Sequence, residues 1–372
     1  MAPFHCEQLT KDNEQDWEAF NRDCPDGTIY HSLRWKQVIE RSFGHKGRYF
    51  IIYDKEKPVA ICPFFEVPLH GRRSLTPPPA TDIRHILVDR AQDMAIYEEV
   101  AKELTAMAKA EGYSFAIVTD PDPRAIERVD ATLSQSRLKT YPLHTNGYFM
   151  LDLKQNPPDY IWNTLLSGKS RRNHRKYVRR FEQSGYTIRD SRDKKDLDLF
   201  YTYYEENLNY IGASPFAKSH FEILFDLFSK DELRMTFLEK DDHLAGGAMG
   251  LIDTQRGAIH LRYLALNRDI GKTYHPPYAL SWEEIQFAYA NNIHLVCFGT
   301  NNKDPMDRNY AMKRGFGPEY HDYYSTVAPM NYGARLIYSG YQKLKEIKDR
   351  DKPVHQASEA GPADEGTKGN GE

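Results

Sequence analysis

The clearest chemical candidate in this sequence is a lysine, Lys313, in the run NYAMKRGFG that ends at Gly317. The run predicts a short helix over residues 308–314, directly after a polar loop over 299–307. A cation held beside such a loop could stabilise the negative charge that develops on a tetrahedral intermediate. Removing one group of this kind typically lowers a rate by ~10²–10³. The alternative is a surface lysine that complements the dipole at the end of a helix.

A carboxylate in the first half of the chain is the second candidate. Asp120 ends a buried strand predicted over residues 114–119 and is followed by Pro121. Carboxylates at strand ends can act as general bases. An aspartate before a proline is also a common turn former, and the sequence leaves both interpretations open.

A strongly basic helix is the third feature, predicted over residues 169–184 with Ser167 as its N-cap and Gly185 just beyond its end. No acidic residue in it comes before Glu182. Like charges three and four residues apart destabilise a helix, so an anionic partner such as nucleic-acid phosphate, or carboxylates from elsewhere, should offset them. The alternative is a solvated charged face. The cations are Lys169, Arg171, Arg172, Arg175, Lys176, Arg179 and Arg180.

Several familiar kinds of site are missing from the sequence. No histidine pair has HxxxH spacing and the four cysteines form no CxxC, so no metal site is predicted. There is no GxSxG motif and no complete glycine-rich phosphate loop. Where an acyl-CoA signature would fall, Arg268 and Gly271 fit its first half, but Pro276 and Pro277 remove two backbone donors. We therefore expect a weakened pyrophosphate site there.

Length and composition indicate a folded protein of two or three domains. The 372 residues are 40% hydrophobic and 13% aromatic, with a net charge of −3. No run approaches the ~18 apolar residues of a transmembrane helix, and the N-terminus lacks the features of a signal peptide. Four cysteines without a disulfide pattern favour a cytoplasmic, reduced location. The oligomeric state is not predicted.

The elements around these candidates predict a strand–helix–strand unit. It consists of a strand over 258–266, a loop over 267–277, a helix over 278–291 and a strand over 294–298. Ligands of such units gather beyond the carboxyl ends of the parallel strands. The polar residues expected at that end include Arg268, Thr300 and Asn301.

The order of elements is similar in the two halves of the chain: hairpin, helix, strand, polar loop, helix, strand. We therefore expect a duplicated α/β domain whose junction lies where QNPPDY breaks the chain. The predicted domains are 1–155 and 156–330, followed by a C-terminal helix over 331–348 and a disordered tail over 349–372. A Pro-rich loop is expected over 74–82.

Three segments make the chain resemble the FemABX superfamily of tandem GNAT-fold transferases. They are LSGKSRRNHRKYVRRFEQSGY (166–186), LRYLALNRDIGKTYHPPYALSWEEIQFAYANN (261–292) and MKRGFG (312–317). Two weaker matches in the first half are HSLRWKQVI (31–39) and VTDPDP (118–123). The resemblance spans roughly residues 15–330. It implies an α/β (α+β) fold of two tandem GNAT-like (acyl-CoA N-acyltransferase fold) domains, with mixed sheets flanked by helices.

The resemblance also assigns roles to residues of this chain. It implies that Lys313 steadies the transition state, that Asp120 matches the carboxylate proposed as base, and that Tyr263 is an aromatic residue of the site. Trp35 and its two neighbours would lie on the substrate-binding helix. The residues expected to bind substrate are Trp35, Lys36, Gln37, Tyr263, Arg268, Tyr278, Thr300 and Asn301.

Members of the superfamily with known activity transfer an aminoacyl group from aminoacyl-tRNA to an amine of a peptidoglycan precursor. The resemblance implies an N-acyltransferase with aminoacyl-tRNA as the favoured donor and acyl-CoA as the next. The expected acceptor is an amine of a cell-envelope precursor or similar small molecule, and no tightly bound cofactor is expected. Two positions depart from the family: Met312 stands where an aromatic residue precedes the lysine, and residues 211–216 hold no arginine. A non-catalytic RNA- or anion-binding module on the same fold is the alternative.

Overall fold

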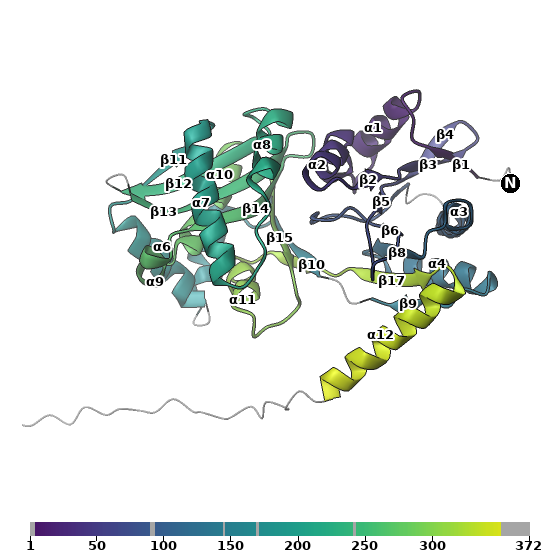
Figure 1. Ribbon diagram of the computed structural model, residues 1–372. Helices are drawn as coiled ribbons and strands as arrows, with labels where there is room; N and C mark the ends of the chain where they lie inside the picture. The colour runs from purple at the N-terminus through teal and green to yellow at the C-terminus, as the bar shows by residue number, and fades with distance from the viewer. Residues whose placement is uncertain (1–3, 90–93, 144–145, 169–170, 241–242, 351–372) are drawn as a thin grey trace, which may run out of the picture.

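The computed structural model describes residues 4–89, 94–143, 146–168, 171–240 and 243–350. It shows two α/β lobes that meet along strands at the centre of the molecule (Figure 1). We define the first lobe by a four-stranded and a six-stranded sheet, and the second lobe by a seven-stranded sheet. Lys169 of the predicted basic helix and the predicted tail from residue 351 onward lie outside the described residues.

The first lobe has strand orders β1-β3-β4-β7 and β2-β5-β6-β8-β17-β9. Its strands are β1 (His5–Gln8), β2 (Lys46–Gly47), β3 (Phe50–Asp54), β4 (Lys57–Cys62), β5 (Phe65–Glu66), β6 (Ser74–Thr76), β7 (Leu87–Val88), β8 (Phe115–Asp120), β9 (Tyr141–Pro142) and β17 (Tyr324–Pro329). Its helices are α1 (Glu14–Asp23), the 3-10 turn η1 (Ile29–His31), α2 (Leu33–Phe43), α3 (Ala95–Glu111), α4 (Pro123–Gln135) and α12 (Tyr332–Arg350).

The second lobe has the strand order β11-β12-β13-β14-β15-β10-β16. Its strands are β10 (Gly147–Asp152), β11 (Thr187–Asp190), β12 (Leu233–Lys240), β13 (His243–Asp253), β14 (Ala258–Leu266), β15 (Leu295–Asn301) and β16 (Glu319–His321). Its helices are α5 (Pro158–Asn163), η2 (Leu165–Ser167), α6 (Arg172–Glu182), α7 (Lys194–Tyr210), α8 (Lys218–Leu227), α9 (Arg268–Tyr274), α10 (Pro276–Ala290) and α11 (Arg308–Gly315). No helix of the described residues has the length and apolar character needed to cross a membrane.

Two strands lie in the lobe opposite to their half of the sequence. β10 comes before the predicted boundary at residue 155, yet it pairs antiparallel with β15 and β16 of the second lobe. β17 comes near the end of the chain and pairs antiparallel with β8 and β9 of the first lobe. Figure 1 shows both strands where the lobes meet. The sheets therefore do not follow the division of the sequence at 155 and 156.

The feature of the second sheet that matters most for function is the point where β14 and β15 separate. The two strands pair in parallel over three residue pairs, the last of which joins His260 to Cys297. Beyond this pair β14 continues to Leu266 alongside β13, whereas β15 continues to Asn301 alongside β10. The carboxyl ends of the two strands therefore diverge, and ligands of α/β sheets bind at such ends.

The largest apolar cluster joins helices of the two lobes. Trp35 from α2 and Phe221 from α8 are both fully buried in it. Helix α2 is placed by local signals, because the Ser32 hydroxyl accepts a hydrogen bond from the Trp35 N–H and Gly44 ends the helix in the left-handed conformation (φ 66°). The packing of α2 on α8 therefore fixes the two lobes against each other at this contact.

Five sequence-based boundaries are wrong. Helix α6 begins at Arg172, with Arg171 at its N-cap, so Ser167 does not cap the basic helix. The segment 267–277, predicted as a loop, contains α9, whose start is capped by Asn267: its side-chain oxygen accepts from the Asp269 N–H at 3.0 Å. The first residues of the predicted loop 299–307 belong to β15, because Asn301 pairs with β10. The predicted Pro-rich loop 74–82 begins with β6, and α12 extends past the expected start of the tail at 349. The extension of β15 and the β6 strand depend on pairing with distant strands, which local patterns do not reveal.

Candidate active site

Lys313 lies beside the diverging ends of β14 and β15. Its helix, α11, begins after Asp307, whose carboxylate accepts hydrogen bonds from the backbone N–H groups of Asn309 and Tyr310. The ammonium of Lys313 donates to the carbonyl oxygen of Thr300 at 3.1 Å. Two residues that the sequence nominated for the site are therefore in direct contact.

A carboxylate from the first lobe, that of Asp82, accepts a hydrogen bond from Thr300. Asp82 lies between β6 and β7, and its Oδ1 accepts a hydrogen bond from the Thr300 N–H at 3.1 Å. Its Oδ2 accepts from Arg262 Nη1 at 2.7 Å and from the Tyr30 hydroxyl at 3.1 Å. Asp82 is only 8% exposed, so this is a buried ion pair that joins the lobes.

Aromatic rings surround the arginine of this pair. Arg262 projects from β14, and its Cζ lies 5.0–5.2 Å from the ring centroids of Tyr30, Trp35 and Tyr263. The guanidinium also donates to the carbonyl oxygen of Ala80, and its Nε donates to the Tyr263 hydroxyl at 3.2 Å. With so many partners, Arg262 holds Asp82 in one position.

A chain of hydrogen bonds runs on from Tyr263 to helix α8. His220 Nε2 lies 2.7 Å from the Tyr263 hydroxyl, and its Nδ1 lies 2.8 Å from the Ser42 hydroxyl of α2. Burial, reinforced by the charge of Arg262, lowers the pKa of His220 to about 3. The imidazole is therefore neutral near pH 7. Since Arg262 already donates to Tyr263, the tyrosine hydroxyl is free to donate to His220.

Lys313 and Asp82 each favour the charged form of the other. Burial lowers the pKa of Lys313, while Asp82, Cys297 and Asp307 oppose that change. Burial likewise disfavours the charged form of Asp82. The charge of Arg262 and the Thr300 N–H outweigh this effect and keep the pKa of Asp82 below its ordinary value. An ammonium kept away from bulk water is suited to stabilising a developing oxyanion.

The three residues predicted on the substrate-binding helix have different surroundings. Trp35 is fully buried, and its indole N–H donates to the hydroxyl of Thr81, the residue before Asp82, at 2.8 Å. Lys36 forms an ion pair with Glu40 one turn further on, with 2.9 Å between Nζ and Oε1. Gln37 is exposed. Of the three, only Trp35 is part of the cluster around Asp82.

Of the other residues predicted to bind substrate, some lie in the site and some lie outside it. Asn301 is buried next to Thr300, and its amide lies 3.4 Å from the Asp307 carboxylate that caps α11. Arg268 on α9 instead donates to the Asn207 side chain. Tyr278 on α10 packs against the rings of His174 and Tyr177 on α6. Within the site the structure thus brings together Lys313, Thr300, Asn301, Tyr263 and Trp35, but not Arg268 or Tyr278.

Asp120 belongs to the first lobe rather than to this cluster. It ends β8, is 3% exposed, and accepts hydrogen bonds from the Tyr97 hydroxyl and the Asp122 N–H at 2.9 Å each. A groove of about 640 Å³ lies nearby, with Tyr324 and Lys303 in its lining. Tyr324 pairs with Asp120 across β17 and β8, and Lys303 follows β15. The groove therefore borders the ends of both β8 and β15.

Helix α6 presents two different faces. Its buried side contains His174, Val178 and Phe181. Its other side is cationic, and Arg175 and Arg179 stack on Trp162 with Cζ-to-centroid distances of 5.2 and 5.7 Å. Within the described part of the chain, no carboxylate forms an ion pair with these cations: Arg171, Arg172, Arg175, Lys176, Arg179 and Arg180.

The buried side of α6 touches the helix that carries Lys313. His174 Nε2 lies 2.9 Å from the carbonyl oxygen of Met312. Because a carbonyl only accepts, His174 must donate from Nε2. Burial lowers the pKa of His174, so the neutral imidazole supplies this bond.

The segment where an acyl-CoA signature would fall lacks some of the backbone donors that such a site uses. The Asp269 N–H at the start of α9 is already bonded to the Asn267 side chain. Helix α10 opens with Pro276 and Pro277, which have no N–H, after His275 in the left-handed conformation (φ 50°). Among the residues that the structure describes, no group of three or more side chains could hold a metal ion.

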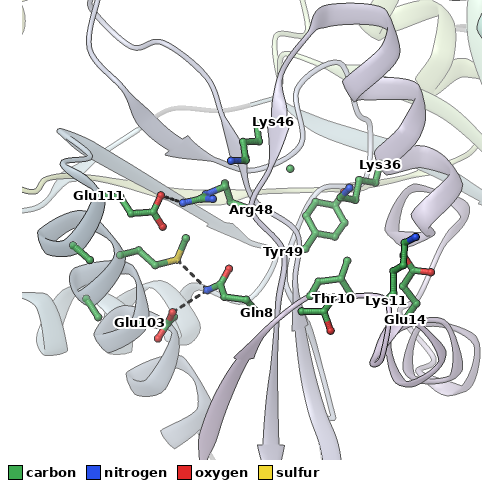
Figure 2. Close-up of a pocket in the computed structure, with 15 residues that line it drawn as sticks. Gln8, Thr10, Lys11, Glu14, Lys36, Lys46, Arg48, Tyr49, Glu103 and Glu111 are labelled. Carbon is green, nitrogen blue, oxygen red and sulfur yellow. Dashed lines mark hydrogen bonds and ion pairs between the residues drawn. The ribbon is translucent and has the colours of Figure 1, made fainter.

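A separate groove of about 680 Å³ lies in the first lobe (Figure 2). On one side of it Arg48 pairs with Glu111 and Gln8 donates to Glu103 at 3.0 Å, while Lys36 lies on the other side. None of the residues in contact with Lys313, Thr300 or Asp82 lines this groove. It is therefore distinct from the site described above.

Sequence reasoning missed three residues of the site: Asp82, Arg262 and His220. Asp82 stood in a segment interpreted only as a Pro-rich loop. One signal was available, because Arg262 lies inside the apolar strand 258–266 and a charge in a buried strand needs a partner. The partner itself could not be identified, since it lies 180 positions away in the chain.

Comparison with known proteins agrees with this architecture. The family model described as Acetyltransferase (GNAT) domain matches residues 168–323. FemX superposes with a TM-score of 0.63 at 13% identity, covering 86% of this chain and 96% of that one. L-PGS from Bacillus licheniformis gives 0.53 at 15%, covering 88% and 94%. A tandem GNAT protein from the clavulanic acid biosynthesis pathway gives 0.55 at 11%, covering 89% and 99%. No curated protein sequence matches significantly.

Residues 168–323 therefore match a GNAT-type acetyltransferase domain, and the chain has the fold shared by FemX and a tandem GNAT protein. The predicted fold class, α/β with mixed sheets flanked by helices, is confirmed. The domain and the fold support an acyltransferase that joins an acyl donor to an amine acceptor.

Proposed function

We propose that the protein is an N-acyltransferase that takes an aminoacyl group from aminoacyl-tRNA. The acceptor is an amine of a cell-envelope precursor or similar small molecule, and the reaction takes place in the cytoplasm, where charged tRNA is made. The observation that carries the choice of donor is the unpaired cationic face of α6, on a helix bonded to the one that bears Lys313.

The geometry of α6 fits a polyanion. Arg172, Lys176 and Arg179 are spaced i, i+4, i+7, so they lie on one face of the helix. Like charges so close together destabilise a helix unless an anion compensates them. A phosphate backbone supplies that compensation, and its contacts position a nucleic acid without reading its sequence. His174, on the opposite side of α6, contacts Met312, so a nucleic acid on the cationic face would bind to a helix that packs directly against the helix of Lys313.

The chemistry is a nucleophilic acyl transfer. The amine nitrogen of the acceptor attacks the ester carbonyl, the new C–N bond forms, and the C–O bond to the terminal ribose breaks. The ammonium of Lys313 has three N–H donors, of which one is bonded to Thr300, so two remain for the oxyanion. We assign Asp120 to remove the amine proton, directly or through water; its cross-strand partner Tyr324 lines the groove near the ends of β8 and β15. The departing ribose oxygen takes up the proton that Asp120 removed, so the carboxylate is regenerated.

Acyl-CoA is the second candidate donor, and the match to a GNAT acetyltransferase model favours it. The helix start that would hold its pyrophosphate argues against it, because Pro276 and Pro277 supply no N–H donors there. The third candidate is a non-catalytic RNA- or anion-binding module. It shares the basic helix but predicts salt-dependent binding without turnover.

A donor competition separates these candidates. The full chain is incubated with total tRNA charged with radiolabelled amino acids, or with labelled acetyl-CoA, and with an extract of cell-envelope precursors. The proposal predicts that label moves from tRNA to an amine acceptor and that ribonuclease treatment beforehand abolishes the transfer. Transfer from acetyl-CoA alone would establish the second candidate. RNA binding with no transfer from either donor would establish the third.

A further inference from the structure

Thr300 is held from both sides by charged residues of different lobes. Its N–H donates to Asp82 of the first lobe at 3.1 Å, and its carbonyl oxygen accepts from Lys313 of the second lobe at 3.1 Å. The position of the carbonyl that binds Lys313 is therefore set by the carboxylate that binds the adjacent N–H, since both belong to one residue.

The backbone before Thr300 is shaped to allow this contact. Gly299 has a left-handed conformation (φ 72°), and a Cβ there would lie 3.2 Å from the Leu261 carbonyl and 3.4 Å from Asp82 Oδ1. Glycine thus permits both the turn of the backbone and the approach of the carboxylate. Asp82 is in turn fixed by Arg262 and Tyr30, so it is a rigid part of the junction.

We propose that Asp82 is a positioning residue for Lys313, so that a carboxylate of the first lobe completes the reaction centre of the second. Its catalytic consequence rests on the proposed function. The effect of Asp82 on the orientation and charge of Lys313 does not, and it is measured separately.

The groups around Lys313 and Asp82 predict how protonation of Lys313 changes when the charge of Asp82 is removed. Lys313 faces Asp82 from the first lobe, Cys297 from β15 and Asp307 from the start of its own helix. Asp82 faces Arg262 and His260 from β14, with Tyr30 from η1. Removing the charge of Asp82 takes away an attraction that favours the ammonium and leaves the positive charge of Arg262 uncompensated nearby. Both changes make protonation of Lys313 harder.

The first experiment follows Lys313 directly. Lysines are labelled with ¹³C at Cε, the Lys313 signal is identified by its loss in Lys313→Arg, and its titration is followed by NMR. In Asp82→Asn the titration midpoint should move to lower pH by roughly one unit, as is typical when one close opposite charge is removed. Glu232→Gln is the control, because it breaks another ion pair between the lobes, to Arg34, away from Lys313. It should leave the midpoint unchanged.

A second variant covers the case in which Asp82→Asn does not fold, since it leaves a buried arginine unpaired. Asp82→Glu keeps the charge but displaces the carboxylate, so Thr300 loses its acceptor. Turnover should fall at least tenfold while the KM for the donor stays within about twofold, the pattern of a misplaced catalytic group. An unchanged midpoint in folded Asp82→Asn, or unchanged turnover in Asp82→Glu, would overturn the inference. If the wild-type protein transfers no acyl group, the proposed function fails, and the NMR titration still decides the role of Asp82.

Discussion

His174 on the basic helix and Met312, the residue before Lys313, are joined by a hydrogen bond of 2.9 Å between His174 Nε2 and the Met312 carbonyl oxygen. This bond connects the buried side of α6, opposite its cationic face, to the helix that carries the candidate catalytic lysine. The position of α6, and with it that of its cations, is therefore fixed relative to the helix that bears the ammonium. The consequences of this arrangement can be tested separately for charge, chemistry and packing.

Removing the ammonium should abolish most of the activity. Lys313→Ala is expected to lower turnover by ~10²–10³, the usual effect of losing one group that stabilises an oxyanion. Arg314→Ala is the matched control, because Arg314 is exposed on the same helix, and it should stay within about twofold. A change of similar size in both variants would show that the helix, and not the ammonium, is responsible.

The pH dependence of turnover should report the same residue. Burial lowers the pKa of Lys313, so the ammonium loses its proton at a lower pH than an ordinary lysine. The protonated form is the active one, and activity should therefore fall on the alkaline side, with a midpoint below the ordinary lysine value of about 10.4. An activity that stays constant up to that pH would contradict the assigned role.

The charge of α6 should control binding of the donor. The triple variant Arg172→Ala, Lys176→Ala, Arg179→Ala removes one cationic face. Each lost phosphate contact lowers the slope of log affinity against log salt by roughly 0.7–0.9, so a total decrease of about 2–3 is expected for tRNA. Lys194→Ala with Lys195→Ala on α7 is the control, since both lysines are exposed outside this face. Equal losses in the two variants would point to a non-specific effect of net charge.

Local patterns were enough to predict several parts of the site. The basic helix, the strand–helix–strand unit and the position of Lys313 near Thr300 follow from spacing and from the rule for parallel strands. The contact between Asp82 and Thr300 could not be predicted, because it joins residues 218 positions apart and depends on how the lobes pack. The exchange of β10 and β17 between the sheets has the same cause, since the sequence shows that a strand forms but not which sheet receives it.

Asp120 and its neighbour Asp122 should respond differently to loss of charge. If Asp120 takes the amine proton, Asp120→Asn should lower turnover by roughly 10² or more. Asp122 caps α4 by accepting a hydrogen bond from the Arg124 N–H at 2.9 Å, so Asp122→Asn should leave turnover nearly unchanged. Steady-state kinetics with a fixed donor compares the two. Full activity in Asp120→Asn would remove it from the mechanism and leave it as a structural residue of β8.

A buried glutamate should make stability depend on pH. Glu284 lies 2.9 Å from Arg234, which Asp190 and Glu283 also contact. Burial raises the pKa of Glu284 to about 7, with Glu283 and Asp190 adding to the effect and Arg234 opposing it. The folded state therefore holds a proton that the unfolded state releases near the ordinary glutamate pKa of 4.5. Stability should fall as pH rises from 4.5 to 7 and stay level above.

The measurement for Glu284 is urea unfolding at several pH values. Glu284→Gln mimics the protonated side chain and should remove the loss, which is about 3 kcal/mol. The control Glu206→Gln changes an exposed carboxylate and should keep the wild-type profile. If Glu284→Gln retained the same fall between pH 4.5 and 7, another group would be its source.

The packing of α6 against α11 can be tested at a glycine. A Cβ at Gly315 would lie 1.9 Å from His174 Nε2, so Gly315→Ala must displace His174 and break its bond to Met312. We expect a loss of about 1–3 kcal/mol in the free energy of unfolding, as for other overpacked positions. Gly333→Ala in α12 is the control, because its Cβ would meet no atom closer than 3.5 Å and alanine favours the helix. If α6 orients the donor toward Lys313, Gly315→Ala should also lower turnover at temperatures where it remains folded, while tRNA affinity, set by the cations, changes less. Turnover equal to wild type in the folded Gly315→Ala variant would show that the contact is structural only.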